Sequence, residues 1–411
     1  MADIRPFEAI RPDKEFAGRV AALPYDVYNR KEAKIAAHRD PLSFLNIDRP
    51  ETQFVDGFDM YDKQAYLKAR EMLGDEIRDG VFIKDETPCY YIYELSADGH
   101  CQTGIVAVSS VDDYLGNVIK RHENIFKEKE TDRINHITFC GAQTGPIFLA
   151  YRSRQEINDI VDREKKSDPV YDFTADDGVT HRVWMVDGPD EIAAIREQFL
   201  AVESIYIADG HHRAASAVDV ALTKRSEDPD FDRDAEFNFF LSVLFPDDQL
   251  QIIDYNRVVR DLNRLSSDAF LDMISVKFEI SRMDERAKPK EKGTIGMFLD
   301  DKWYLLTAKD FIRSDDPVKG LDVSILQDNI LSPILGIHDP KNDKRISFVG
   351  GIRGLCELER RCRTDMRVAF AMHPTTIGEL FAVSDAGLLM PPKSTWFEPK
   401  LRSGIFIHRI D

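Results

Sequence analysis

The sequence lacks any apolar run near the ~20 residues that cross a bilayer. Its opening residues, MADIRPFEAIRPDKEF, also lack the apolar core of a signal peptide. The five cysteines are an odd number without CxxC spacing, so neither a disulfide framework nor a zinc cluster is expected. No internal repeat is visible, which excludes solenoids and propellers. We therefore expect a soluble cytoplasmic protein with reduced, mostly buried thiols.

The sequence also has fewer basic residues than acidic ones. Lys and Arg number 55 against 73 Asp and Glu, a formal net charge of -18, which opposes broad attachment to nucleic acids or anionic lipids. Any anion that binds must therefore meet a local basic pocket. The 411 residues exceed the size at which a single hydrophobic core keeps growing, so we expect two domains or one large domain with insertions.

Apolar spacing and turn residues predict a mixed α/β chain, with a mixed sheet in place of a regular Rossmann repeat. The predicted strands are 21–27, 90–95 and 103–108 (a hairpin around Asp98-Gly99), 147–151, 181–186, 204–208, 239–245, 296–306 (a hairpin that turns at Asp300-Asp301) and 404–408. The predicted helices are 62–78, 189–200, 213–223, 323–335 and 377–386. The charged stretch 283–292 predicts a joint, which divides the chain into a core of residues 1–282 and a C-terminal α/β subdomain of residues 283–411.

The segment Asp209-Gly210-His211-His212-Arg213 is the sharpest candidate site. Where a strand ends at Gly210 and a helix follows, the first N–H groups of the helix point into the turn. These N–H groups can bind a phosphate. Arg213 can add a two-pronged contact, and one histidine can face the anion while the other orients it. Asp209 is a candidate acid, base or Mg²⁺ ligand.

Two other interpretations of this segment stay open. Asp209 and Gly210 can form a plain tight turn with polar histidines on the surface. Asp209, His211 and His212 can also be considered as transition-metal ligands, although adjacent histidines seldom converge on one ion.

A second cluster lies at Lys120-Arg121-His122-Glu123, followed by Lys127, Lys129, Asp132 and Arg133. Its cations can hold further phosphate oxygens, while Glu123 can accept the proton of a substrate hydroxyl. The alternative is a solvated charged helix, because residues 119–135 are dense in charges of both signs.

Two further segments carry candidate residues. In Lys393-Ser394-Thr395, a lysine and two hydroxyls follow two prolines that stiffen the approach, so the loop can close over a phosphate or form a structural turn. Asp26, after Pro24-Tyr25, is an alternative base, in a segment that is also typical of structural turns.

The string Ile207–Ala215 resembles the phosphate-binding turn of the ParB/sulfiredoxin superfamily, which includes free-serine kinases. Over nearly the whole chain, the sequence is similar to a widespread prokaryotic family known as domain of unknown function 1015. This similarity rests on the following strings: Pro24–Val27, Arg121–Glu123, Asp132-Arg133, Asp209–Arg213, Pro391–Thr395 and Pro399-Lys400.

The resemblance implies a ParB/sulfiredoxin-like core elaborated by large insertions, with nucleotide or phosphate bound at residues 209–213. It also implies Mg²⁺-assisted, ATP- or ADP-dependent phosphoryl transfer to a small hydroxyl compound such as serine. Arg213 and Lys393 would neutralise charge, and Glu123 or Asp26 would activate the acceptor. Because residues 30–200 and 230–411 have no counterpart in the smaller serine kinases, two alternatives stay open. They are a non-catalytic nucleotide or phosphometabolite sensor and a ParB-like DNA-binding protein or nuclease, which the net charge opposes.

Overall fold

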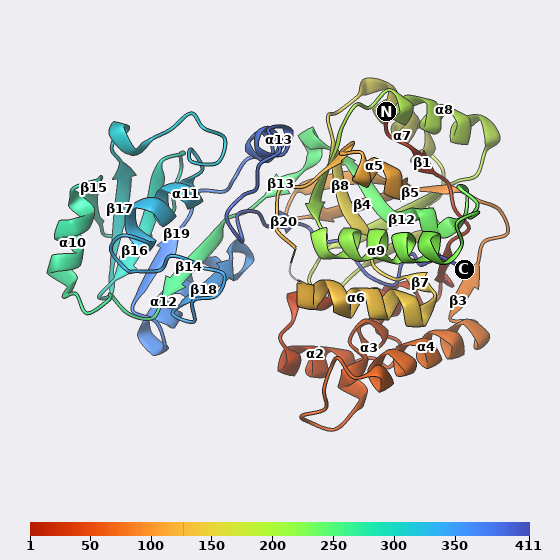
Figure 1. Cartoon of the computed structure of the whole chain (residues 1–411), viewed down its shortest axis with the longest axis horizontal. Coiled ribbons are helices and arrows are strands. Elements are labelled where there is room, and N and C mark those ends of the chain that lie inside the picture. The colour runs from red at the N-terminus through yellow and green to blue at the C-terminus, as the bar shows by residue number, and fades with distance from the viewer. Residues whose placement is uncertain (126) are drawn as a thin grey trace. The chain divides into compact units, whose positions relative to one another are not determined.

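The computed structural model describes residues 1–125 and 127–411, so one residue of the charged stretch 119–135 lies outside the described part. The chain divides into two compact units (Figure 1). Unit 1 comprises Met1–Arg121, Ile125–Leu250 and Pro399–Asp411, and unit 2 comprises His122–Asn124 and Gln251–Glu398. The division after Leu250 differs from the expected boundary after residue 282, because two strands between these points pair within the sheet of unit 2.

Unit 1 is built on a mixed sheet, with the strand order β6-β11-β8-β12-β5-β4-β10-β9 and with β1 paired to β5. Its strands are β1 (Ile4–Arg5), β4 (Tyr90–Ala97), β5 (His100–Ser110), β6 (Ile119–Lys120), β8 (Ile147–Tyr151), β9 (Tyr171–Thr174), β10 (Thr180–Val186), β11 (Ile205–Asp209) and β12 (Phe239–Pro246). β11 runs parallel to β6 and antiparallel to β8, and β12 runs parallel to β8 and antiparallel to β5. The predicted mixed sheet is confirmed.

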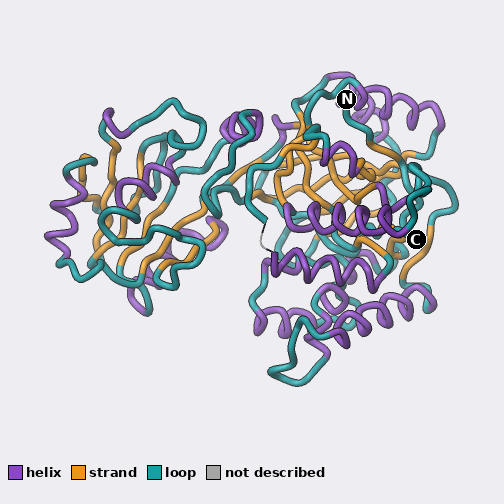
Figure 2. Tube along the Cα trace, in the orientation of Figure 1, coloured by secondary structure: helices purple, strands orange, loops and turns teal. Residues whose placement is uncertain are grey.

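Helices cover this sheet, as Figure 2 shows, and α6 lies beside both α9 and α4. The helices of unit 1 are α1 (Ala17–Val20), α2 (Arg30–Ala37), α3 (Leu45–Asp48), α4 (Lys63–Arg78), α5 (Val111–Leu115), α6 (Lys127–Cys140), α7 (Gln155–Glu164), α8 (Pro189–Leu200) and α9 (His211–Glu227). The predicted helix that begins after Asp62 is confirmed, with the Asp62 side chain accepting a hydrogen bond from the Gln64 N–H. Within the described residues, none of the helices combines the length and apolar character that a membrane span requires.

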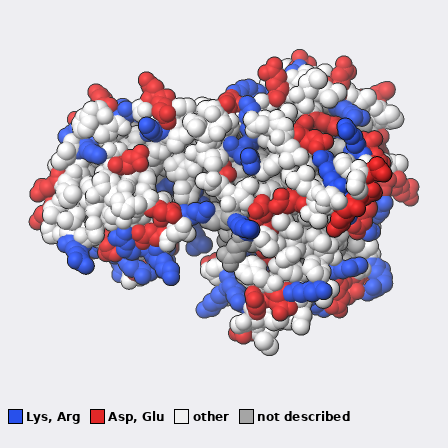
Figure 3. Space-filling view, viewed as in Figure 1, with Lys and Arg blue, Asp and Glu red and all other residues white. Residues whose placement is uncertain are grey.

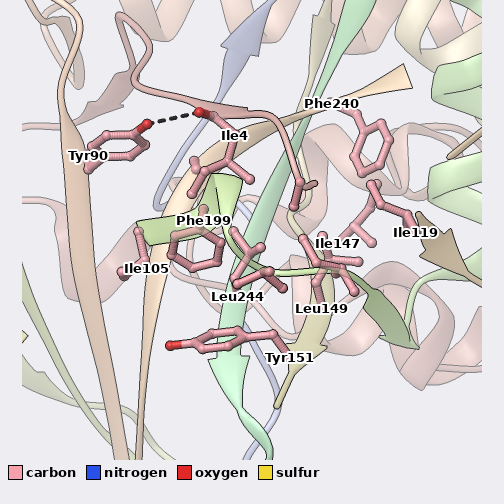
Figure 4. Packing of buried hydrophobic residues seen from close by; sticks show 14 of the residues in the cluster. Ile4, Tyr90, Ile105, Ile119, Ile147, Leu149, Tyr151, Phe199, Phe240 and Leu244 are labelled. Carbon is pink, nitrogen blue, oxygen red and sulfur yellow. Dashed lines mark hydrogen bonds between the residues drawn. The ribbon is translucent and has the colours of Figure 1, made fainter. Parts of the chain in front are cut away.

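The main core of unit 1 lies between the sheet and the helices that pack on it (Figure 4). Ile105, Leu149 and Leu244 from the central strands meet Phe199 of α8 in this core. The predicted apolar face of α9 is buried in the same cluster through Ala214, Ala217, Val218 and Ala221. Burying one large aliphatic or aromatic side chain contributes about 1.5–3 kcal/mol, and each alanine of α9 contributes less.

Unit 2 contains a second sheet with the strand order β15-β17-β16-β19-β14-β18. Its strands are β14 (Tyr255–Val259), β15 (Phe278–Met283), β16 (Thr294–Leu299), β17 (Lys302–Ala308), β18 (Ile346–Gly350) and β19 (Val368–Ala371). Its helices are α10 (Ser267–Ser275), α11 (Asp322–Leu326), α12 (Gly354–Thr364) and α13 (Ile377–Asp385). The predicted hairpin at Asp300-Asp301 is confirmed, with both aspartates at positive φ. The predicted helix 323–335 consists of α11 and a π-helical turn, Gln327–Leu331.

Short strand pairs complete the two units. They are β2 (Ile10–Pro12) with β3 (Phe82–Lys84), β7 (Ala142–Gln143) with β21 (His408–Arg409), and β13 (Gln251–Ile252) with β20 (Phe397–Glu398). Two of the predicted strands, 21–27 and 404–408, are wrong. In 21–27, an isolated bridge at Ala22 leads into a 3₁₀ turn, Tyr25–Val27, and in 404–408, Gly404 has φ +84° and packs on Phe44, so pairing into a named strand begins only at His408.

Candidate functional site

The turn between β11 and α9 has the geometry that the sequence predicts. β11 ends at Asp209, Gly210 caps the helix with φ +95° and ψ +29°, and the 17-residue α9 begins at His211. Glycine suits this left-handed conformation, and a Cβ atom at Gly210 would lie 3.1 Å from Nε of Arg213. Because the first N–H groups of a helix have no intrahelical acceptor, α9 presents donors and its positive dipole end at this turn.

The Asp209 carboxylate is held by the protein on both oxygens. Oδ1 accepts a hydrogen bond from the Gly210 N–H at 2.9 Å, and Oδ2 accepts one from Nζ of Lys400 at 3.0 Å. Burial acts to raise the pKa of Asp209, but the charges of Lys400 and Arg213 outweigh it, and the pKa lies well below its ordinary value. Asp209 is therefore an ionised partner of Lys400 at neutral pH.

This arrangement does not fit the predicted Mg²⁺ site at Asp209. Each carboxylate oxygen already accepts one hydrogen bond, and the ammonium of Lys400 beside Oδ2 would repel a second cation. Across residues 1–125 and 127–411, His, Cys, Asp and Glu form no cluster of three or more that could hold a metal ion. The transition-metal interpretation of the two histidines likewise gains no support.

Arg213 points partly into the interior of unit 1. Its side chain is 11% exposed, Nη1 donates to the carbonyl of Pro146, and Nη2 lies 4.0 Å from Asp209 Oδ2. One edge of the guanidinium therefore contacts other residues of the protein. The remaining donors can still contribute to an anion site at the turn, because Arg213 carries five N–H groups.

The two histidines differ in burial. His211 is buried, and burial is the largest effect that lowers its pKa, to about 3, against the opposing charge of Asp209. Its imidazole is therefore neutral at pH 7 and can orient a ligand without adding charge. His212 is the second residue of α9 and is partly buried.

Arg121 belongs to the same edge of the sheet as the turn. β6 pairs in parallel with β11, with Ile119 opposite Ile205 and Lys120 opposite Tyr206. Since parallel strands end at the same edge, Arg121 leaves β6 on the side from which α9 starts. The exposed Arg121 donates to the Tyr114 hydroxyl at 3.3 Å and its charge lowers the pKa of His211.

Asp26 lies in the 3₁₀ turn Tyr25–Val27 and its side chain is exposed. The turn is anchored by the buried Arg49, whose Nη1 donates to the Tyr25 carbonyl at 2.9 Å. Arg49 is in turn paired with Glu51 at 2.7 Å. Asp26 thus sits on a rigid turn but faces solvent.

The other predicted site residues belong to unit 2. His122 is buried, its carbonyl accepts a hydrogen bond from the Met390 N–H at 2.8 Å, and Glu123 is partly exposed. Lys393 is exposed at φ +59°, and Thr395 is partly exposed. The Ser394 hydroxyl donates to the Pro391 carbonyl at 2.6 Å, so it stabilises the loop.

The buried Arg257 also holds this loop. Its Nη2 donates to the carbonyl of Lys393 at 3.0 Å and contacts that of Pro392 at 3.4 Å. The Thr375 hydroxyl donates to the Ser394 carbonyl at 2.9 Å. The structural interpretation of residues 393–395 is therefore well supported by these contacts.

Sequence reasoning did not assign a site role to Lys400, nor, apart from Arg133, to the residues around a small cavity beside Arg213. The cavity measures about 30 Å³, and its polar lining comprises Tyr25, Asp48, Arg133, His136, Gln143, Thr144, Arg213 and Ser403. The charged stretch is not simply solvated, because Asp132 and Arg133 are buried. The sequence did point to some of these residues, because the strings that carry the family similarity include Tyr25, Arg133 and Lys400.

Comparison with known proteins gives one extended match. The family model described as "Protein of unknown function (DUF1015)" matches residues 4–324. No curated protein sequence matches the chain.

Several solved structures share weak similarity of fold. A free serine kinase mutant in complex with AMP is 13% identical, with 73% of this chain and 92% of that chain covered and a TM-score of 0.36. A conserved hypothetical protein from Pyrococcus furiosus is 16% identical, with 74% and 95% covered and a TM-score of 0.36. SbnI with a C-terminal truncation, from Staphylococcus aureus, is 13% identical, with 72% and 85% covered and a TM-score of 0.38.

Proposed function

We propose that this chain, which belongs to the DUF1015 family, binds the phosphate groups of a nucleotide at the turn between β11 and α9. The observation that carries the proposal is the left-handed Gly210 between a buried strand and a 17-residue helix. This conformation turns the first N–H groups of α9 toward the end of β11. Such an arrangement binds phosphate through hydrogen bonds and the helix dipole together.

The charges around the turn support the same conclusion. Asp209 is neutralised by Lys400, while Arg213 and Arg121 add positive charge from α9 and from the end of β6. Elsewhere, Asp and Glu are interspersed with Lys and Arg over the surface shown in Figure 3, in a chain of net charge -18. The turn is therefore a local basic spot in an acidic protein, and local charge of this kind favours a small anion over a polyanion.

The activity that follows from this binding is phosphoryl transfer from ATP or ADP to a small alcohol such as serine. Phosphoryl transfer depends mainly on positioning and on charge neutralisation, which main-chain N–H groups and arginines supply. The Mg²⁺ that we expected at Asp209 is not part of this proposal, because that carboxylate already has a protein partner on each oxygen. Of the two predicted bases, Asp26 is exposed and Glu123 belongs to unit 2, so neither is part of this proposal.

Calorimetry of the full chain with ATP, ADP and inorganic phosphate tests the binding site. We expect Arg213→Gln to weaken nucleotide binding about tenfold or more, because a charge-assisted contact contributes about 1.5–3 kcal/mol. Arg39→Gln, at an exposed arginine of unit 1, is the matched control and should bind like the wild type. Equal affinity of Arg213→Gln and wild type, or no nucleotide binding at all, would contradict the proposed site.

Phosphorus NMR tests the transfer. Incubation with L-serine and either nucleotide, with and without Mg²⁺, should produce a phosphoserine signal. If no phosphoserine forms under any of these conditions, the kinase proposal is wrong.

One observation favours a second function, a non-catalytic sensor of a nucleotide or phosphometabolite. Asp209 is the carboxylate at the turn, and its contact with Lys400 lowers its pKa, which makes it a weak base. A sensor should bind nucleotide without turning it over, so calorimetry combined with a phosphate-release assay separates the two functions.

A further inference from the structure

The cavity beside Arg213, which we call the Asp48 cavity, lies within unit 1 and is walled by α3, α6, α9 and β12. Asp48 is the last residue of α3, and Arg133 and His136 belong to α6. Arg213 also belongs to the turn proposed to bind phosphate. A chemical group inside the cavity therefore shares an arginine with that turn.

Asp48 is an unusual carboxylate because it is only 2% exposed and has a single partner. The Thr144 hydroxyl donates to Oδ1 at 2.9 Å. Among residues 1–125 and 127–411, no hydrogen bond reaches Oδ2, and no Lys, Arg or His nitrogen lies within 4.0 Å of either oxygen. Oδ2 is not fully enclosed by protein atoms, and Asp48 lines the cavity. A carboxylate oxygen that lines a cavity and has no protein donor can accept a hydrogen bond from a ligand or an ordered water.

The charged neighbours of Asp48 are already satisfied. Arg133 pairs with Asp132 at 2.8 Å, and the Tyr66 hydroxyl donates to the other oxygen of Asp132 at 2.9 Å. The guanidinium of Arg133 also lies 4.1 Å from the centre of the Tyr25 ring. Arg133 therefore contacts Asp132 and Tyr25, and Oδ2 of Asp48 keeps its capacity to accept a hydrogen bond.

Two other polar groups of the cavity, the imidazole of His136 and the hydroxyl of Tyr25, carry no charge. Nε2 of His136 lies 3.0 Å from the Ile47 carbonyl, and burial is the largest effect lowering the pKa of His136, so its ring is neutral. Within the described chain, the Tyr25 hydroxyl makes no hydrogen bond to another residue, and burial raises its pKa, so it stays protonated. The cavity thus offers one anionic acceptor and one neutral hydroxyl to whatever enters.

The size of the cavity limits what can enter. A volume of about 30 Å³ exceeds the minimum of roughly 10–15 Å³ that one water needs, but it is far smaller than a nucleotide site. The space suits a hydroxyl or hydroxymethyl group at the end of a larger molecule. A base or ribose has no room there.

We propose that Asp48 is the general base of the phosphoryl transfer, and that the hydroxyl end of a small primary alcohol enters the Asp48 cavity. This inference rests on the proposed function. The alcohol O–H bond breaks as its proton moves to Oδ2 of Asp48, and the alcohol oxygen forms a bond to the terminal phosphorus of the nucleotide. The bond between that phosphorus and its bridging oxygen breaks, and its electron pair leaves with the shortened nucleotide.

In this arrangement Thr144 is a positioning residue, because its hydroxyl holds Oδ1 and so directs Oδ2. Arg213 lines the cavity and lies beside Gly210 of the turn, so in this proposal its guanidinium contacts both the acceptor and the phosphate. Within unit 1, Asp48 replaces the exposed Asp26 as the proposed base, because a buried site limits transfer of the phosphoryl group to water.

The test uses the full chain with ATP or ADP as donor, and L-serine, glycerol and water as acceptors. Asp48→Asn keeps the shape of the side chain and the bond from Thr144, so it should fold and bind nucleotide within about twofold of the wild type. Its turnover should fall by about 100-fold or more, as expected for loss of a general base. Asp176→Asn, at an exposed aspartate of unit 1, is the matched control and should keep full turnover.

Thr144→Val provides a second arm that does not depend on the first. It removes the hydroxyl but preserves the shape, so kcat should fall about tenfold while the nucleotide Kd and the KM for the acceptor stay within twofold. Circular dichroism and the melting temperature confirm that each variant is folded.

The outcomes separate the two proposals. Turnover of Asp48→Asn within threefold of the wild type overturns the role of Asp48 while the phosphate site stands. Nucleotide binding by the wild type without turnover toward any of the three acceptors also overturns it and supports the sensor. Absence of nucleotide binding overturns the proposed function, and the role of Asp48 falls with it.

Discussion

Lys400 follows Asp209 by 191 residues, yet its Nζ lies 3.0 Å from Oδ2 of that aspartate. The contact exists because the C-terminal segment returns to unit 1, where Ser403 bridges Ala22 and β21 pairs with β7. Arg402, two residues beyond Lys400, is buried and pairs with Asp177, which fixes the same segment to the sheet. The charge balance at the turn is thus set by the last residues of the chain.

Removing Lys400 should make the protein less stable. Lys400→Met leaves the mostly buried Asp209 carboxylate without its cation, which should cost about 1–3 kcal/mol of unfolding free energy at pH 7. Because the folded pKa of Asp209 is lowered, this contribution is complete above the unfolded pKa of about 3.9 and is lost as the pH falls below it. Denaturant titrations at pH 7 and pH 3 should therefore show a smaller difference between variant and wild type at pH 3, and Lys400→Arg should recover most of the loss.

Protonation of His181 should destabilise the fold. Nε of Arg402 donates to Nε2 of His181 at 3.1 Å, so Nδ1 carries the proton and donates to the Tyr93 hydroxyl oxygen at 2.8 Å. Burial and the charge of Arg402 lower the pKa of His181 to about 3, so its stabilising effect is complete above the unfolded pKa of about 6.5 and is lost as the pH falls toward 3. In NMR titrations, the His181 ring signal should stay constant between about pH 8 and pH 5. A midpoint near 6.5 would contradict this network.

The conformation of Gly210 should be essential to the turn. Gly210→Ala places a Cβ atom at φ +95° and 3.1 Å from Nε of Arg213, and we expect a loss of about 1–3 kcal/mol in stability together with weaker nucleotide binding. Gly178→Ala is the matched control, since it has φ +82° but nothing within 4 Å of the added atom. The control should show the backbone strain alone, with unchanged binding. Equal nucleotide affinity of both variants would argue against a ligand at the turn.

Arg257 should hold the Lys393 loop in its observed conformation. Burial lowers its pKa to about 10, so it stays charged at pH 7 and donates to the carbonyls of Tyr255 and Lys393. Arg257→Met removes these donors and should cost about 1–3 kcal/mol, since a hydrogen bond to a charged group contributes about 1.5–3 kcal/mol and these carbonyls are only partly buried. Hydrogen exchange of residues 391–395 and trypsin cleavage after Lys393 should both accelerate. Unchanged exchange in this segment would show that other contacts hold the loop.

The local features of the chain were accessible from sequence. The helix after Asp62, the hairpin around Asp98-Gly99 and the β11-turn-α9 unit follow from short-range patterns of apolar spacing, capping and positive-φ turn residues. The mixed sheet also follows, because the strand and helix patterns do not alternate regularly. Each of these inferences depends on residues within one element or its flanking turns.

The sequence-based predictions were wrong where contacts with residues far away in the sequence determine the local structure. Residues 404–408 have the apolar pattern of a strand, but Gly404 packs on Phe44, so named-strand pairing starts only at His408. Asp132 and Arg133 belong to a stretch that looks solvated, but α6 buries them where they contact Tyr66 and Tyr25. A sequence pattern cannot show these contacts, because it carries no information about which remote segment will cover it.

The sequence by itself determined the family, the mixed α/β class and the strand-turn-helix at 209–213, since each depends on residues that are neighbours along the chain. Only the tertiary structure decided that Lys400 neutralises Asp209, that Arg213 faces a cavity as well as the turn, and that Asp48 is buried with one oxygen unpaired. The physical reason is that charge neutralisation and desolvation depend on distances through space. Those distances are set by how the C-terminal segment and the helices pack on the sheet.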